Sequence, residues 1–147
     1  MAMVISMDVS ATEELYSDQY TTVYFLLVQK IAVVKVHNAF VPMSNYREAL
    51  RQIAGFAEQR QINKLIIDAQ NLVAYHRPSV DWSFTDWKRQ AFNYGLSVYC
   101  YVLPRNGEYQ KKLKNEIHRI NNANPELGFL KQIRISFCDS LDEAIME

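Results

Sequence analysis

The sequence predicts an α/β domain whose mixed, mostly parallel sheet of five strands carries its helices mainly on one face, in the order ββαβαβαβα. From about residue 40 onward, strand-like apolar runs alternate with amphipathic helical stripes, which implies parallel strands joined by right-handed crossovers. The later strand-like runs alternate apolar and polar residues, whereas strands buried on both faces are apolar throughout. At 147 residues the chain has the length of one domain. We place this domain at residues 22–147, after an N-terminal arm of residues 1–21, in which a short strand or turn is an open alternative.

The first predicted elements are two strands, a helix and a third strand. Residues 22–28 and 31–37 are rich in β-branched and aromatic side chains, and the polar pair between them favours a hairpin, although this turn lacks Gly and Asn. Ser44 is a good N-cap, and the apolar stripe behind it predicts a helix over residues 45–60. The third strand is expected at residues 64–69.

The second helix is predicted to open at Pro78, with Ser79 or Asp81 as its cap, and to stop at Gly95. Its expected buried stripe consists of Val80, Phe84, Trp87, Ala91 and Tyr94. The remaining predicted elements are a strand at residues 96–103, a helix at 109–120, a strand at 133–138, and a short helix that begins at Leu141 behind a cap at Asp139 or Ser140.

Alternation along the strands predicts two different faces of the sheet. The helices are expected to cover Val34, Val36, Val98, Cys100, Val102, Ile133, Ile135 and Phe137. The opposite face is expected to carry Lys35, His37, Tyr99, Tyr101 and Arg134. We expect the N-terminal arm or a second subunit to cover this face, so that Lys35, Tyr99, Tyr101 and Arg134 form a predicted homodimer face. Cys100 and Cys138 are interpreted as buried, reduced thiols on the helix-covered side.

Composition and charge exclude some classes of function. Lys plus Arg balance Asp plus Glu, 16 against 16, so nothing in the overall charge favours nucleic acid binding. No run approaches about 20 apolar residues, so no membrane span is expected. Residues 1–10 lack the basic and apolar segments of a signal peptide. We therefore expect a cytoplasmic protein.

Candidate binding residues follow the third strand, where α/β domains usually place a site. They are Asp68, Tyr75, His76, Arg77, Ser79 and Trp82. Asp68 either orients His76 or binds a ligand hydroxyl, or it caps the loop by accepting backbone N–H groups, and the cap is the favoured interpretation. Trp82 lies beside the buried stripe of its helix, so it either packs under the loop or belongs to a binding surface.

The sequence offers no catalytic, metal or cofactor signature. The histidines His37, His76 and His118 and the two cysteines stand at no metal-ligand spacing. The four glycines form neither a phosphate loop nor a nucleophile elbow. We therefore expect no cofactor, no metal and no catalytic residue.

In the order of its motifs the chain resembles SpoIIAA-like, STAS-type domains, and most closely their bacterial branch of unknown function. The resemblance covers roughly residues 22–147. Its motifs are the opening hairpin, Phe40-Val41-Pro42 before Ser44, Ile66-Ile67-Asp68 followed by Asn71-Leu72, Trp87 in the second helix, and Phe137-Cys138-Asp139-Ser140-Leu141-Asp142-Glu143-Ala144. The resemblance implies βα units wound in sequential order and a regulatory or binding module rather than an enzyme.

Signalling members of that family carry a phosphorylatable serine after the third strand. This chain has Arg77-Pro78-Ser79-Val80 at the matching place, so the family's serine motif is absent. A plain helix cap is therefore favoured over phosphorylation for Ser79.

The leading hypothesis is a non-enzymatic STAS-like module that binds a partner protein or a small ligand at the loop between the third strand and the second helix, as a homodimer. One alternative is a small-ligand carrier or an enzyme with an apolar pocket that uses Asp68 and His76. Another alternative is a homodimer with a structural role.

Overall fold

The computed structural model describes residues 11–74, 77–123 and 128–147, and its strands form one mixed sheet. The strands are β1 (Thr12–Ser17), β2 (Thr21–Leu26), β3 (Ile31–Val36), β4 (Lys64–Asp68), β5 (Val98–Val102) and β6 (Arg134–Cys138). They lie side by side in the order of the sequence, β1-β2-β3-β4-β5-β6. The pairs β1–β2 and β2–β3 are antiparallel, and the pairs from β3 to β6 are parallel.

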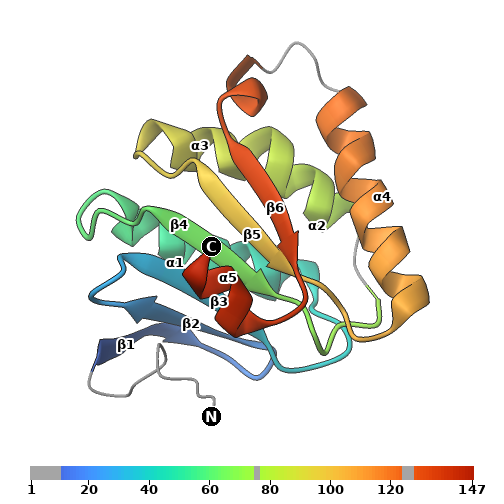
Figure 1. The fold of residues 1–147 in the computed structure, drawn as a ribbon. Helices are drawn as coiled ribbons and strands as arrows, with labels where there is room; N and C mark the ends of the chain where they lie inside the picture. Colours follow the sequence, from blue (N-terminus) through green and yellow to red (C-terminus); the bar gives the residue numbers. More distant parts are fainter. Residues whose placement is uncertain (1–10, 75–76, 124–127) are drawn as a thin grey trace.

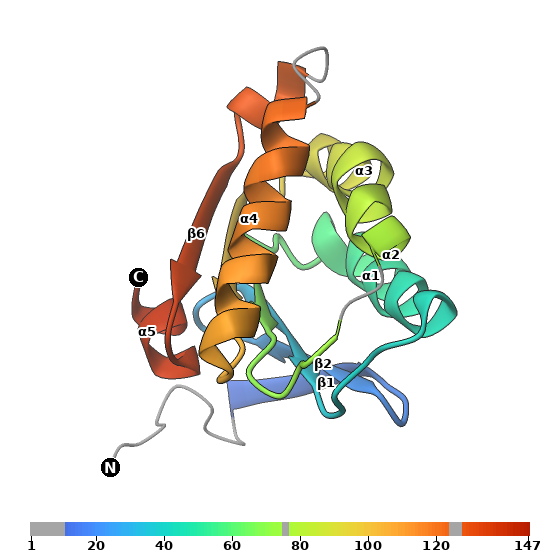
Figure 2. The same cartoon turned by 90° about the vertical axis from the view of Figure 1, so that its right-hand side faces the viewer.

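The helices fall on both faces of this sheet, unequally. They are α1 (Met43–Ala57), α2 (Arg77–Trp82), the π-helical turn η3 (Ser83–Trp87), α3 (Lys88–Asn93), α4 (Gly107–Ala123), the 3₁₀ turn η4 (Gly128–Lys131) and α5 (Leu141–Met146). Figures 1 and 2 show α1, α2, α3 and α4 together on one face and the short α5 on the other. The predicted α/β class and the mainly one-sided helix layer are therefore confirmed.

The prediction of five strands is wrong, because β1 lies within the segment expected to be an arm. β1 is an edge strand that reads Thr-Glu-Glu-Leu-Tyr-Ser, and its pairing with β2 shifts register between Glu14 and Tyr16. An edge strand needs little apolar surface and often carries charges and a bulge. The hydrophobic pattern of β1 was therefore too weak to predict it.

The β2–β3 hairpin is confirmed, with a longer turn than expected. Residues 27–30 connect the strands, and the Lys30 N–H donates to the Leu26 carbonyl at 2.9 Å. Lys30 has φ +62°, so it takes the left-handed conformation for which Gly or Asn is the usual choice.

Two hydrophobic cores flank the sheet. The larger lies between the sheet and helices α1 to α4, and the smaller packs α5 against β2–β6 around Val33, Ile66 and Val102. The predicted faces hold for β6, where Ile133, Ile135 and Phe137 pack toward the larger core.

The predicted faces are wrong for β5. Tyr99 and Tyr101 lie in the larger core, whereas Cys100 lies in the smaller core beneath α5, where Cys138 also lies. β5 is a central strand that is buried on both faces, so its alternation of tyrosine with smaller residues does not distinguish inside from outside.

The predicted homodimer face is therefore not one surface. Tyr99 and Tyr101 are buried beneath the main helix layer. Lys35 pairs with Asp68 along β3–β4, and Arg134 pairs with Val98 along β5–β6; the register places both on the face of α5.

Two predicted helix caps are displaced. α1 begins at Met43, one residue before Ser44, and the Tyr46 N–H donates to the Pro42 carbonyl at 3.0 Å. α2 begins at Arg77, so Ser79 and Asp81 lie inside the helix and not at its N-cap position. Single-residue patterns place helix ends only to within about two residues.

The second helix contains a wide turn that matters for the site. The Lys88 N–H donates to the Ser83 carbonyl, five residues earlier, which is the hydrogen bond of a π-helix. The wide turn brings Ser83, Phe84, Trp87 and Lys88 all to buried positions. The helix stops as predicted before Gly95, whose φ of +99° suits glycine.

The N-cap of α5 is Ser140, one of the two residues predicted for this position. The Glu143 N–H donates to Ser140 Oγ at 3.1 Å. We expect Ser140→Ala to lower the free energy of unfolding by about 1 kcal/mol, because this N–H loses its partner. Urea denaturation followed by circular dichroism measures the change, and Asp139→Ala is the matched control, with an effect within about 0.5 kcal/mol. Equal effects of the two substitutions would contradict the assigned cap.

Candidate functional site

The candidate site is an apolar pocket on the helix-covered face, at the carboxyl ends of β3, β4 and β5. Its cavity volume is about 60 Å³. It is lined by Val36, Val41, Tyr46, Ile67, Ala69, Leu72, Ala74, Val80, Tyr101, Leu113 and Ile117. Open α/β sheets bind ligands at the carboxyl ends of their parallel strands, so the position is that of a binding site.

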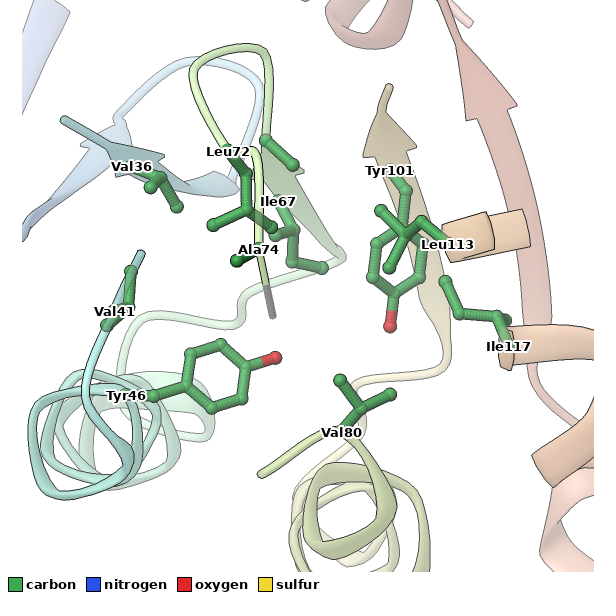
Figure 3. A pocket seen from close by; sticks show the side chains of 11 residues that line it. Val36, Val41, Tyr46, Ile67, Leu72, Ala74, Val80, Tyr101, Leu113 and Ile117 are labelled. Carbon is green, nitrogen blue, oxygen red and sulfur yellow. The ribbon is translucent and has the colours of Figure 1, made fainter. Parts of the chain in front are cut away.

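Two phenol groups supply the polar part of this pocket. Figure 3 shows the hydroxyls of Tyr46 and Tyr101 pointing from opposite walls, α1 and β5, toward the same space, with Val80 beside them. Burial raises the pKa of Tyr46 to about 12, and a hydrogen bond with Ser83 opposes part of that rise. Burial also raises the pKa of Tyr101 well above its ordinary value. Both hydroxyls are therefore protonated near neutral pH, so each has one O–H to donate and lone pairs that accept.

A buried lysine lies behind Tyr101. Lys88 is 2% exposed, and its Nζ donates to Tyr101 Oη at 2.8 Å. Aromatic rings surround the amine, with Nζ 3.9 Å from the ring centre of Phe84 and 4.7 Å from that of Tyr99. Burial lowers the pKa of Lys88 to about 7. In the described ranges no carboxylate forms an ion pair with Lys88.

This arrangement fixes the direction of the hydrogen bonds in the pocket. A lysine ammonium has three donors and no acceptor, so Tyr101 Oη accepts from Lys88. The O–H of Tyr101 then remains available to donate to another acceptor, and Figure 3 shows this hydroxyl facing the pocket. The polar end of the pocket therefore presents donors, which suits an acceptor atom on a ligand.

The predicted site residues do not form this pocket. Asp68 is buried at the end of β4, and its Oδ1 accepts from the backbone N–H of Gln70 at 3.3 Å and from Gln70 Nε2 at 3.0 Å. These contacts fit the loop-capping interpretation. Ile67 and Ala69 point toward the pocket, so the alternating strand directs Asp68 to the other face.

The other predicted residues have different positions. Tyr75 and His76 lie outside the described residues. Arg77 and Ser79 belong to the first turn of α2, and their side chains also lie outside the description. Trp82 is half-buried at the margin of the larger core, with the Arg47 guanidinium 5.1 Å from its ring centre. Trp82 therefore ties α2 to α1 and does not line the pocket.

Sequence reasoning missed Lys88 although a signal was present. Lys88 stands four residues after Phe84 and three before Ala91, so it occupies the buried stripe of its own helix. A charged residue on an apolar stripe is expensive to bury, and such residues cluster at functional sites. Tyr46 was part of a predicted stripe, but a stripe does not reveal which of its members face a cavity.

A second hollow lies between α4 and β6. Its volume is about 120 Å³, and it is lined by Ile117, His118, Ile133, Ile135 and Phe137. The ring of His118 lies 5.6 Å from that of Phe137. It lies along the edge strand, away from the convergent hydroxyls, so we do not assign the site there.

Three potential metal ligands meet beneath α5. Cys100 Sγ lies 2.8 Å from Cys138 Sγ, and Glu147 Oε2 lies 3.7 Å from Cys138 Sγ. Metals bind the thiolate, but burial raises the pKa of Cys138 above its ordinary value. Structural zinc sites use four protein ligands, and this cluster offers three. The cluster is therefore a weaker candidate than the pocket.

No family model matches the chain, and no curated protein matches it. Within the described part of the chain, no helix combines the length and the apolar character needed to cross a membrane.

Proposed function

We propose that this protein is a non-enzymatic, STAS-like module that binds a small, largely apolar molecule through a hydrogen-bond acceptor at one end of that molecule. The observation that carries the proposal is the pocket between α1, α2, α4 and the sheet, in which aliphatic walls surround the two hydroxyls of Tyr46 and Tyr101. Ligand pockets typically combine mainly apolar walls with a few convergent polar groups.

The chemistry of the lining favours binding over catalysis. No side chain that carries a formal charge is among the described residues that line the pocket. Both phenols have raised pKa values, so they stay protonated near neutral pH and supply no general base. Lys88, whose pKa is about 7, is separated from the cavity by Tyr101.

The sequential strand order supports the STAS-like part of the proposal, because the resemblance implies βα units wound in that order. The loop after β4 and the start of α2 contribute Leu72, Ala74 and Val80 to the pocket, which favours the small ligand over the partner protein at this place. The homodimer and the cytoplasmic location remain predictions. Light scattering that shows a monomer at micromolar concentration would contradict the predicted homodimer.

A neutral probe tests the proposed pocket. We expect 2-heptanone, whose carbonyl end enters the cavity while part of its apolar chain extends from the open side, to shift the amide NMR signals of Ala69, Leu72 and Val80 in a saturable way. Leu72→Trp places a large side chain in the cavity, so we expect it to weaken this binding at least about tenfold, a change of about 1.4 kcal/mol.

The neighbouring substitution Val73→Trp is the matched control, because Val73 is 53% exposed and does not line the pocket. It is expected to leave binding unchanged. Absence of saturable shifts in the unsubstituted protein would contradict the proposal, and so would equal binding by both tryptophan variants.

A further inference from the structure

Lys88 is a buried cation that the proposed function does not yet explain. An isolated charge in an apolar environment is unfavourable, and proteins retain it where a partner charge compensates it. The side chains around Nζ are the rings of Phe84, Tyr99 and Tyr101, and burial is the cause of its lowered pKa. Within residues 11–74, 77–123 and 128–147, no counter-charge is therefore found in its immediate surroundings.

The polar groups beside Lys88 form a chain that ends in the pocket. Lys88 donates to Tyr101 Oη at 2.8 Å, and the Tyr101 hydroxyl faces the same space as the Tyr46 hydroxyl. The two hydroxyls are close enough for a negative charge on Tyr46 to raise the pKa of Tyr101. A ligand group bound between the hydroxyls of Tyr46 and Tyr101 accepts a hydrogen bond from each, and only the Tyr101 side chain separates it from the Lys88 amine.

We propose that the ligand is a small monocarboxylic acid with an apolar body, whose carboxylate accepts hydrogen bonds from Tyr46 and Tyr101 and supplies the missing counter-charge of Lys88. This inference rests on the proposed function, since it names the ligand class of the same pocket. A carboxylate is an acceptor-only group, which matches the O–H donors of the two phenols. A peptide C-terminus fits less well, because its amide groups would meet apolar walls without partners.

Proton linkage follows from the neighbours of Lys88. Among the described residues, the titratable groups that face it are Tyr99 and Tyr101 from β5 and, across the pocket, Tyr46 from α1. These phenols stay neutral because burial raises their pKa values. From α4 the pocket receives Leu113 and Ile117, and Glu116 of the same helix pairs with Arg119. Lys88 is therefore the group that gains a proton when a carboxylate binds near neutral pH.

Two probes of nearly equal shape separate this inference from the proposed function. Hexanoate carries a carboxylate where 2-heptanone carries a methyl ketone, and both have the same five-carbon chain. Isothermal titration in buffers of different ionisation enthalpy measures affinity and proton uptake. We expect hexanoate to bind with proton uptake near pH 7, and about 30-fold more weakly at about pH 8.5 than at about pH 6, while 2-heptanone shows no pH dependence.

Lys88→Met tests the residue. It is expected to abolish the proton uptake and the pH dependence of hexanoate binding. Lys112→Met is the matched control, since the Lys112 side chain is 61% exposed on α4, and it should keep both properties.

The outcomes are distinguishable. If 2-heptanone binds and hexanoate does not, or if hexanoate binds without proton uptake, the carboxylate inference is overturned and the proposed pocket stands. If neither probe binds, both are overturned. If hexanoate binding keeps its pH dependence in Lys88→Met, Lys88 is not the counter-charge.

Discussion

Replacing Lys88 by methionine is expected to stabilise the protein at about pH 6, by about 3 kcal/mol. The pKa of this lysine falls from 10.5 to about 7 on folding, which corresponds to a cost of about 5 kcal/mol at about 1.4 kcal/mol per pKa unit. Methionine has a similar length and no charge, so it removes that cost. It also removes the hydrogen bond to Tyr101, and this loss reduces the gain in stability by about 1–2 kcal/mol.

The direction of the pH dependence is fixed by the two pKa values. Between about pH 7 and 10.5 the unfolded chain holds a proton on Lys88 that the folded protein lacks, so stability rises with pH across this window. The gain from Lys88→Met is therefore complete below about pH 7 and fades toward pH 10.5.

Urea denaturation at about pH 6 and about pH 9.5 measures both parts of this prediction. Lys112→Met should stay within about 0.5 kcal/mol of the unsubstituted protein at each pH, because its amine is exposed. A loss of stability in Lys88→Met at about pH 6 would show that the buried amine has a compensating partner, contrary to the site described above.

Replacing Trp87 by alanine is expected to cost about 4 kcal/mol. Trp87 is 1% exposed, and its indole Nε1–H donates to the Leu50 carbonyl of α1 at 2.7 Å. Its ring meets that of Tyr99 edge to face, with centres 6.2 Å apart. The Trp87 side chain therefore connects α1, the π-helical turn and β5. Its loss leaves a cavity and leaves the Leu50 carbonyl without its hydrogen-bond donor.

Trp87→Phe separates these contributions. It keeps most of the ring and removes the indole N–H, so we expect it to cost about 1–2 kcal/mol. Trp82→Ala is the comparison for a tryptophan at the margin of the core, with a smaller cost than Trp87→Ala because Trp82 is only half-buried. Circular dichroism during urea denaturation measures all three variants. Equal losses for Trp82→Ala and Trp87→Ala would contradict the assigned core.

The elements with strong periodicity were predictable from the sequence, and the weak ones were not. The hairpin, the long helices and the later parallel strands follow from patterns of two and 3.6 residues. β1 was not predicted because an edge strand needs few apolar residues. β5 was assigned the wrong faces because Tyr99 and Tyr101 are large, polar-tipped side chains that a doubly covered strand buries as readily as valine.

The approximate position of the site could be predicted from the sequence, but most of the residues that line it could not. The loop after the third predicted strand and the start of the second helix do border the pocket, through Ala69, Leu72 and Val80. Its walls come from residues such as Leu113 and Ile117, which a sequence pattern cannot distinguish from core. Lys88 was readable as a charge on an apolar stripe, but its contact with Tyr101 depends on the wide turn at residues 83–87 and on the face of β5.

The central claim is that a small apolar molecule binds between the hydroxyls of Tyr46 and Tyr101. The most direct measurement is the set of intermolecular nuclear Overhauser effects between 2-heptanone and ¹³C-labelled protein. We predict contacts from the ketone to the ring of Tyr46 and to the methyl groups of Val80 and Leu113. Contacts confined to the second hollow, at Ile133, Ile135 and Phe137, would contradict the claim.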